Sequence, residues 1–278
     1  MTYRAIKVSH LPPVVVVDQA APILAWISIA DLVIDDHYQR PLTPTSWLAI
    51  RKIAEAFRWG RFTPVLVSPI EAGRYAVIDG QHRCHAAALC GLAAVPCMVV
   101  HLAQAEQASA FSWVNSNVTR ISPHHLYRAG LAAGETWAER CQIAVAGAGC
   151  TLATSNPSSK DKKAKVVYCI GLVRRMVAYG HSEAVRAGLA ALVAYDVTGR
   201  VALYSEYVLA PWLGAISEVP RASGADLAAV LQLHDPFKVL DVVARNLEGS
   251  KSGGLASARK AAFAMLIRRQ MAAAAVAA

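Results

Sequence analysis

Hydrophobic and polar positions in the first part of the chain follow the spacing of short β-strands. Apolar runs occupy residues 26–34, 63–78 and 95–100, and a Glu-Ala-Gly turn divides the second run into two. Between these runs, residues 46–60 and 81–91 have apolar residues at helical spacing. Each of these two segments ends on a glycine that is expected to stop the helix. The pattern therefore predicts strands and helices mixed in one domain.

Beyond residue 123 the apolar residues recur every three or four positions, as they do in amphipathic helices. Such segments occur at residues 124–149, 164–180, 182–196, 201–219, 225–233 and 258–275. A short strand at 150–154 is the main indication of sheet, and the polar residues 155–165 and 248–254 are expected to form exposed loops. We predict an α+β chain, with a mixed sheet-and-helix domain over residues 1–128 and an all-α half over residues 129–278.

Composition excludes some classes of protein. The chain has 278 residues, of which 55% are hydrophobic, so it can bury a core and is not disordered over most of its length. Residues 84–105 lack charged side chains, but Gly91, Pro96 and two histidines interrupt them, which favours a helix-turn-strand unit over a membrane span. No signal-peptide pattern opens the chain. We expect a cytoplasmic protein with no membrane partner.

Charge and cysteine content bear on the partners. The formal net charge of +9 favours an anion such as DNA, contacted largely without sequence specificity. The six cysteines form no C-x-x-C pair, which argues against a disulfide framework and a structural zinc site. They are expected to be small buried residues. Cys84 lies near a predicted helix start, a setting that lowers the pKa of a thiol.

The segment VIDGQHRCHAA, residues 77–87, is the densest cluster of reactive side chains. A strand, an Asp79-Gly80 turn and a helix that begins near Gln81 leave unpaired backbone N–H groups at the helix start, where an anion is favoured. Gly80 allows close approach to the backbone, and Arg83 adds a forked, permanent charge. These features predict a phosphate site. The alternative is that Asp79 caps the helix and Arg83 pairs with a nearby carboxylate.

The histidines around this segment have a second interpretation. Asp79, His82 and His85, together with His124 or His125, are residue types that bind zinc or iron. No pattern of supporting residues is readable around such a site, and histidines beside a phosphate more often donate to the anion. We therefore favour the phosphate over a transition metal.

Four separated segments resemble, in the same order, the N-terminal domain of the ParB and sulfiredoxin superfamily, in its DGQHR-type branch. They are YQRPL, GRFTPVLVS, GRYAVIDGQHRCHAAALCGLAAVPCMVV and VNSNVTRISPHHLYRA, within about residues 25–128. The resemblance implies a ParB/sulfiredoxin-like fold and a pocket for a nucleoside triphosphate with Mg. Sulfiredoxins place a reactive cysteine where this chain has Gln81, so their reaction is not expected.

The resemblance also implies which residues contact the nucleotide. The expected contacts are Gly80, Gln81, His82, Arg83, His85, Ala86, Gln39 and Arg40. Gly80, Arg83 and Ala86 match the ParB phosphate-binding segment Gly-Glu-Arg-Arg-x-Arg-Ala, whereas the residues between them differ. Gln39 and Arg40 match a Gln-Pro-Arg loop that lies against the base, without its proline.

Departures from the family concern the chemistry of hydrolysis. Where the family has Glu-Asn-x-x-Arg, this chain has Val114, Asn115 and Val118. The metal-associated asparagine, Asn115, is kept, while the acid used in hydrolysis and a phosphate-binding arginine are replaced by valines. Arg120 supplies a charge two positions further on, and we include it among the phosphate ligands. Asp79 is the best-placed acid for a catalytic role.

Three classes of function remain open. The first is a ParB-like nucleotide-binding protein associated with DNA, with a homodimer as a further expected assembly. The second is an enzyme that uses the same pocket, either a nuclease or a small-molecule phosphotransferase, since some relatives with D-G-x-x-R motifs are kinases of free serine. The third is a non-catalytic interaction module. Val114, in place of the family's hydrolytic acid, favours nucleotide binding over turnover. The net positive charge favours DNA as a partner. The second half shows no readable helix-turn-helix.

Overall fold

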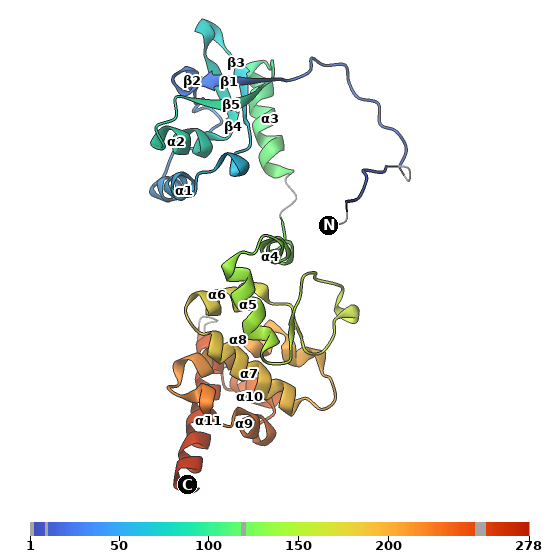
Figure 1. The fold of residues 1–278 in the computed structure, drawn as a ribbon, viewed down its shortest axis with the longest axis vertical. Helices are drawn as coiled ribbons and strands as arrows, with labels where there is room; N and C mark the ends of the chain where they lie inside the picture. The colour runs from blue at the N-terminus through green and yellow to red at the C-terminus, as the bar shows by residue number, and fades with distance from the viewer. Residues whose placement is uncertain (1–2, 9–10, 118–120, 248–253, 278) are drawn as a thin grey trace. The chain divides into compact units, whose positions relative to one another are not determined.

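The computed structural model describes residues 3–8, 11–117, 121–247 and 254–277 (Figure 1). The chain divides into two compact units, Met1–Thr119 and Arg120–Ala278. This division falls earlier than residue 128 because helix α4 (Pro123–Ala132) places Tyr127 in the core of the second unit.

A mixed five-stranded sheet forms the centre of the first unit. Its strands are β1 (Ile23–Ser28), β2 (Leu32–Val33), β3 (Val65–Pro69), β4 (Tyr75–Asp79) and β5 (Ala94–Val99), in the order β1-β5-β3-β4-β2. β3 pairs antiparallel with β4 and parallel with β5. The expected turn at 71–73 joins β3 to β4. The predicted strands of this domain are therefore confirmed.

Three helices accompany this sheet. They are α1 (Pro44–Glu55), α2 (Gln81–Leu89) and α3 (Gln104–Ser116). Thr43 caps α1 by accepting a hydrogen bond from the backbone N–H of Ser46. α2 packs on α1 (Figure 1). It buries Cys84 and Ala87 in the sheet core. The expectation that Gly60 ends α1 is wrong, because the helix stops at Glu55 and the next residues turn to pack aromatic rings together.

Helices make up most of the second unit. They are α4, α5 (Thr136–Ala146), α6 (Ile170–Ala178), α7 (Ser182–Tyr195), α8 (Glu206–Glu218), α9 (Leu227–Leu233), α10 (Pro236–Asn246) and α11 (Leu255–Ala277). Buried large side chains such as Leu189, Trp212 and Phe263 form one core. The Trp212 indole donates to the carbonyl of Gly188 at 2.9 Å, where α7 and α8 approach closely.

A small sheet element departs from a purely helical second half. β6 (Thr151–Leu152) pairs in parallel with β7 (Val166–Val167), and the first of these lies in the short strand expected at 150–154. The loop between them, 155–165, is polar and largely exposed, as predicted, whereas most of the second expected loop, 248–254, lies outside the described residues. The α+β prediction is confirmed, with this ladder as an addition to the helical half.

The cysteines are free thiols, and four of the six are buried. Burial raises the pKa of the Cys84 thiol to about 12, so the expected lowering of that pKa is wrong. The physical reason is that Cys84 faces the sheet core rather than the helix start. Among the described helices, none is long and apolar enough to cross a membrane.

Candidate functional site

The turn between β4 and α2 is shaped by Gly80. Its backbone is left-handed, with φ 111° and ψ 15°, and it occupies the N-cap position of α2. A Cβ placed there would lie 2.8 Å from Nη2 of Arg83 and 3.2 Å from Cγ1 of Val65. Glycine therefore meets both the conformational and the steric demand of the turn. No side-chain hydrogen bond from the described residues caps this helix start.

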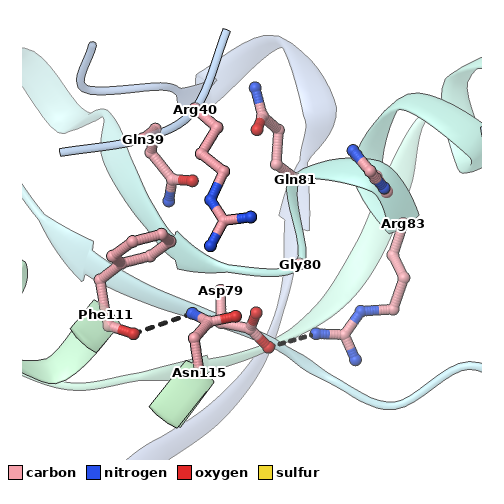
Figure 2. A pocket seen from close by; sticks show the side chains of 9 residues that line it. Gln39, Arg40, Asp79, Gly80, Gln81, Arg83, Phe111 and Asn115 are labelled. Atoms are coloured by element: carbon pink, nitrogen blue, oxygen red, sulfur yellow. Dashed lines mark hydrogen bonds and ion pairs between the residues drawn. The ribbon is translucent and has the colours of Figure 1, made fainter. Parts of the chain in front are cut away.

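A pocket of about 410 Å³ opens at this helix start. Its lining comes from three separate segments: the loop before α1, the β4–α2 turn and the end of α3 (Figure 2). The lining residues are Gln39, Arg40, Asp79, Gly80, Gln81, His82, Arg83, Phe111 and Asn115. Eight of these nine are residues that the sequence analysis selected. Fold and motif therefore converge on one site.

Arg83 is held by contacts within the first unit. Its Nη2 donates to Oδ2 of Asp79 at 2.8 Å, and its Nη1 donates to the carbonyl oxygen of Thr63 at 3.1 Å. The two charged side chains are 20% and 35% exposed, respectively. The arginine–carboxylate pairing considered as an alternative is thus present. The capping part of that alternative is not, because Gly80 occupies the N-cap position.

Arg40 is the cation that remains available in the pocket. Its side chain makes no hydrogen bond or ion pair with any residue that the structure describes. Figure 2 shows its guanidinium pointing into the middle of the pocket, toward the Asp79-Gly80 turn. An unpaired guanidinium at such a place favours an anionic ligand.

Gln39 fixes the loop that carries Arg40. Its buried amide Nε2 donates to the carbonyl oxygens of Val77 and Ile78, at 2.8 and 2.9 Å, near the end of β4. With that nitrogen engaged, Gln39 acts first as a positioning residue for the loop. The loop is thereby held against the strand that leads into the Gly80 turn.

Asn115 and Phe111 bring α3 to the pocket. They lie four residues apart and so share one face of the helix, and Asn115 Nδ2 donates to the Phe111 carbonyl at 2.8 Å (Figure 2). The Phe111 ring also packs against Tyr38, with centroids 5.7 Å apart. Sequence reasoning missed Phe111, although its spacing from Asn115 was a usable signal.

The remaining candidate residues lie at different depths. His82 lines the pocket, whereas the Nδ1 atom of His85 is 2.8 Å from the Gln81 carbonyl and His85 is not part of the lining. Ala86 is fully buried in the domain. Arg120 lies outside the described residues.

The described residues contain no group of three or more His, Cys, Asp or Glu side chains that could hold a metal ion. At the pocket, Asp79 pairs with Arg83 through Oδ2, and its Oδ1 and the Oδ1 of Asn115 make no hydrogen bond with the described residues. Mg²⁺ commonly takes one or two protein ligands and completes its shell with phosphates and waters. The pocket therefore contains side-chain oxygens that would fit a Mg²⁺ ion, with Asn115 and Asp79 as the residues that would hold it.

The match to a family model lies within the first unit. Residues 24–116 match the family model of the ParB N-terminal domain. No curated protein matches the chain. Solved structures with some likeness include the C-terminally truncated chromosome-partitioning protein ParB of Caulobacter crescentus in complex with CTP-gamma-S. It is 17% identical, with a TM-score of 0.35, over 76% of this chain and 97% of that chain.

A second structure of the same Caulobacter crescentus protein, complexed to the centromeric parS site, is 20% identical with a TM-score of 0.30, over 88% of this chain and 99% of that one. A Pnob8-like ParB-N domain is 11% identical with a TM-score of 0.29, over 90% and 96% of the two chains. The match to the family model is the finding that assigns the domain. Residues 24–116 of this chain are a ParB-like N-terminal domain.

Proposed function

We propose that this chain is a ParB-like nucleotide-binding protein that associates with DNA. One observation carries the proposal: the Gln39-Arg40 loop, the turn at Gly80 and Asn115, which are far apart in the sequence, line a single pocket of the ParB-like domain (Figure 2). That convergence is expected of a ligand site and not of three independent structural motifs.

Phosphate groups are the ligand chemistry that the β4–α2 end of the pocket favours. The start of α2 directs backbone N–H groups outward, and the helix dipole adds a partial positive charge there. Arg40 adds an unpaired full charge, while the charge of Asp79 is offset by its ion pair with Arg83. The net charge at this end of the pocket is therefore positive.

The α3 side supports a nucleoside attached to those phosphates. Phe111 offers an aromatic ring and Asn115 an amide, and both lie on the same helix at the pocket (Figure 2). The volume of about 410 Å³ lies within the range of small-molecule sites. An aromatic ring beside a polar amide suits stacking on a base together with hydrogen bonding.

Binding is proposed here without turnover. Of the described residues that line the pocket, Asp79 is the single carboxylate, and its ion pair with Arg83 occupies one of its oxygens. A nuclease or phosphotransferase would need a general base together with metal-binding carboxylates. Val114 occupies the place of the family acid. The pocket thus suits a ligand that is held rather than cleaved.

The test is a calorimetric titration of the full chain with ATP, CTP, GTP and ADP, with and without Mg²⁺. We expect at least one triphosphate to bind, and Arg40→Gln to weaken it about tenfold to a hundredfold, because a charge-assisted contact contributes about 1.5 to 3 kcal/mol. Arg74→Gln, which removes an exposed arginine of the same unit outside this pocket, serves as the matched control. Failure of the parent protein to bind any of the four nucleotides would contradict the proposal.

A further inference from the structure

Residues 57–62, Phe-Arg-Trp-Gly-Arg-Phe, alternate aromatic and cationic side chains between α1 and β3. The Phe57 and Phe62 rings lie 5.7 Å apart and pack against the sheet core. The Trp59 ring contacts both of them, at 5.0 and 5.6 Å between centroids. Trp26, on the edge strand β1, contacts Trp59 at 5.2 Å. The two phenylalanines therefore anchor a pair of tryptophans at the surface.

The tryptophans are exposed to an extent that core packing does not require. Trp26 is 64% exposed and Trp59 is 47% exposed. Indole rings are usually highly buried, and grouped exposed apolar side chains commonly mark an interaction site. The ring edges that meet in this cluster hold the tryptophans in place, and the exposed parts remain free for a ligand.

A hollow of about 280 Å³ lies beside the ring cluster, and it is basic. Among the described residues, its lining contains Lys52, Arg58, Arg61 and Arg83 and no carboxylate. The side chains of the first three form no ion pair or hydrogen bond within the described chain, because the nearby Glu55 pairs with Arg51. The unit up to residue 119 has nine basic and eight acidic residues, so this concentration of positive charge is local.

We infer that this aromatic-arginine surface, made of Trp26, Lys52, Phe57, Arg58, Trp59, Arg61 and Phe62, binds a single-stranded segment of nucleic acid. The unpaired cations contact backbone phosphates in and around the hollow, and bases stack on the exposed indoles. The hollow is smaller than typical sites for whole ligands, and it suits a backbone phosphate better than an entire nucleotide.

The two kinds of side chain together select this partner. An acidic peptide would use the cations but has no flat ring systems to cover the indoles. A DNA duplex offers phosphates, but its base faces are stacked inside the helix. A single strand presents both groups at once, and base stacking on aromatic side chains tolerates any sequence. This surface is distinct from the nucleotide pocket, although Arg83 lines both hollows.

The first measurement is a fluorescence-anisotropy titration of the full chain with a labelled oligothymidylate. Trp26→Ala should weaken binding about fivefold to a hundredfold through the lost stacking. Arg58→Gln should lower the slope of log K against log salt by about 0.7. The matched controls are Trp113→Ala, which removes a tryptophan of the same unit that is 69% exposed, and Arg74→Gln. Both controls should bind like the parent protein.

A second measurement locates the contact independently of any other basic surface. Ultraviolet crosslinking of an iodouracil-substituted oligonucleotide, followed by mass spectrometry, should identify peptides that contain Trp26 or Trp59. Crosslinks only to other peptides, or equal affinity of the parent and Trp26→Ala, would overturn the inference. The inference would also be overturned if Trp26→Ala lost as much affinity for a DNA duplex or for polyglutamate as for oligothymidylate, since neither of these offers free base faces.

Nucleotide titrations of the same variants separate this inference from the proposed function. Trp26→Ala and Arg58→Gln should leave nucleotide affinity unchanged, because neither residue lines the pocket at Gly80. Loss of oligonucleotide binding with intact nucleotide binding supports the surface on its own. Unchanged melting temperatures would show that the exposed side chains were removed without damage to the fold.

Discussion

Two arginines at the pocket have roles that the sequence alone assigned differently. Arg83 was expected either to supply a charge for a phosphate or to pair with a nearby carboxylate; it pairs with Asp79, and Arg40 is the arginine of the pocket without a partner among the described residues. Asp79 ends β4 and Arg83 lies in the first turn of α2, so the turn at Gly80 brings the two side chains together. The availability of Arg40 was not readable, because it depends on which side chains from distant segments surround it.

Asp79→Asn tests what the acid does. The substitution removes a negative charge from a pocket proposed for anions and releases Arg83 toward the ligand. We expect nucleotide affinity in calorimetry to rise a few-fold, since a partly exposed ion pair contributes up to about 1 kcal/mol. The melting temperature should fall slightly. Glu71→Gln, an exposed acid outside this pocket, is the control. Loss of nucleotide binding would instead place Asp79 among the ligand contacts.

Elements formed by local patterns were predictable, and those set by remote contacts were not. β3, β4, α2 and β5 follow from alternation, helical spacing and glycine stops. α3 was not predicted as a helix because its buried position is Gln107 and its Trp113 is exposed. α10 was missed because Asp235 and Pro236 resemble a break in the chain, whereas they are its cap and first residue.

Gly80→Ala tests the start of α2 as an element. Alanine would have to adopt a positive φ and also press on Arg83 and Val65. Gly91→Ala is the matched control, because Gly91 also has a positive φ, of 75°, but nothing within 4 Å of a Cβ. We expect both variants to lose about 1 kcal/mol of unfolding free energy from strain. Gly80→Ala should lose more, and only Gly80→Ala should lose nucleotide affinity. If the two variants lose the same unfolding free energy in urea denaturation, the Arg83 side chain has moved aside to make room for the new Cβ.

The start of α10 predicts a pH dependence for the second unit. Burial alone would raise the pKa of Asp235. Hydrogen bonds from Tyr195, Arg200 and two backbone N–H groups together lower it by more, so the pKa lies below the ordinary 3.8. A depressed carboxyl pKa stabilises the fold above the unfolded pKa, and the stabilisation is lost as pH falls through the folded value. Asp235→Asn should therefore lower the free energy of unfolding at neutral pH.

The same variant should approach the parent protein as pH falls through the lowered pKa of folded Asp235, below which the carboxyl is protonated in both folded and unfolded chains. Asp241→Asn, an exposed acid on the same helix without a side-chain partner among the described residues, is the control. The measurement is urea unfolding at a series of pH values. A constant difference between Asp235→Asn and the parent at every pH would show that the cap, not the charge, stabilises α10.

At the scale of the whole molecule, positive charge is distributed unevenly. The sequence up to residue 119 carries nine basic and eight acidic residues, whereas the sequence from residue 120 carries 19 basic and 11 acidic ones. The net charges of these two parts are therefore +1 and +8. Anion binding in the first unit must come from local placement, as at Arg40, because its overall field is weak. The field that attracts a long polyanion comes from the second unit.

This distribution predicts how duplex DNA binds. Phosphate contacts release condensed counterions, so affinity should fall steeply with salt and differ little between unrelated sequences. In mobility-shift assays of the full chain, we expect a shift at about 50 mM salt that weakens by about a thousandfold or more at about 200 mM. Arg40→Gln should leave that salt dependence unchanged, because Arg40 lines the pocket proposed for a nucleotide, in the part of the chain that carries only +1. If the parent protein produces no shift even at low salt, DNA association is removed from the proposed function, while nucleotide binding at Gly80 still stands on its own titration.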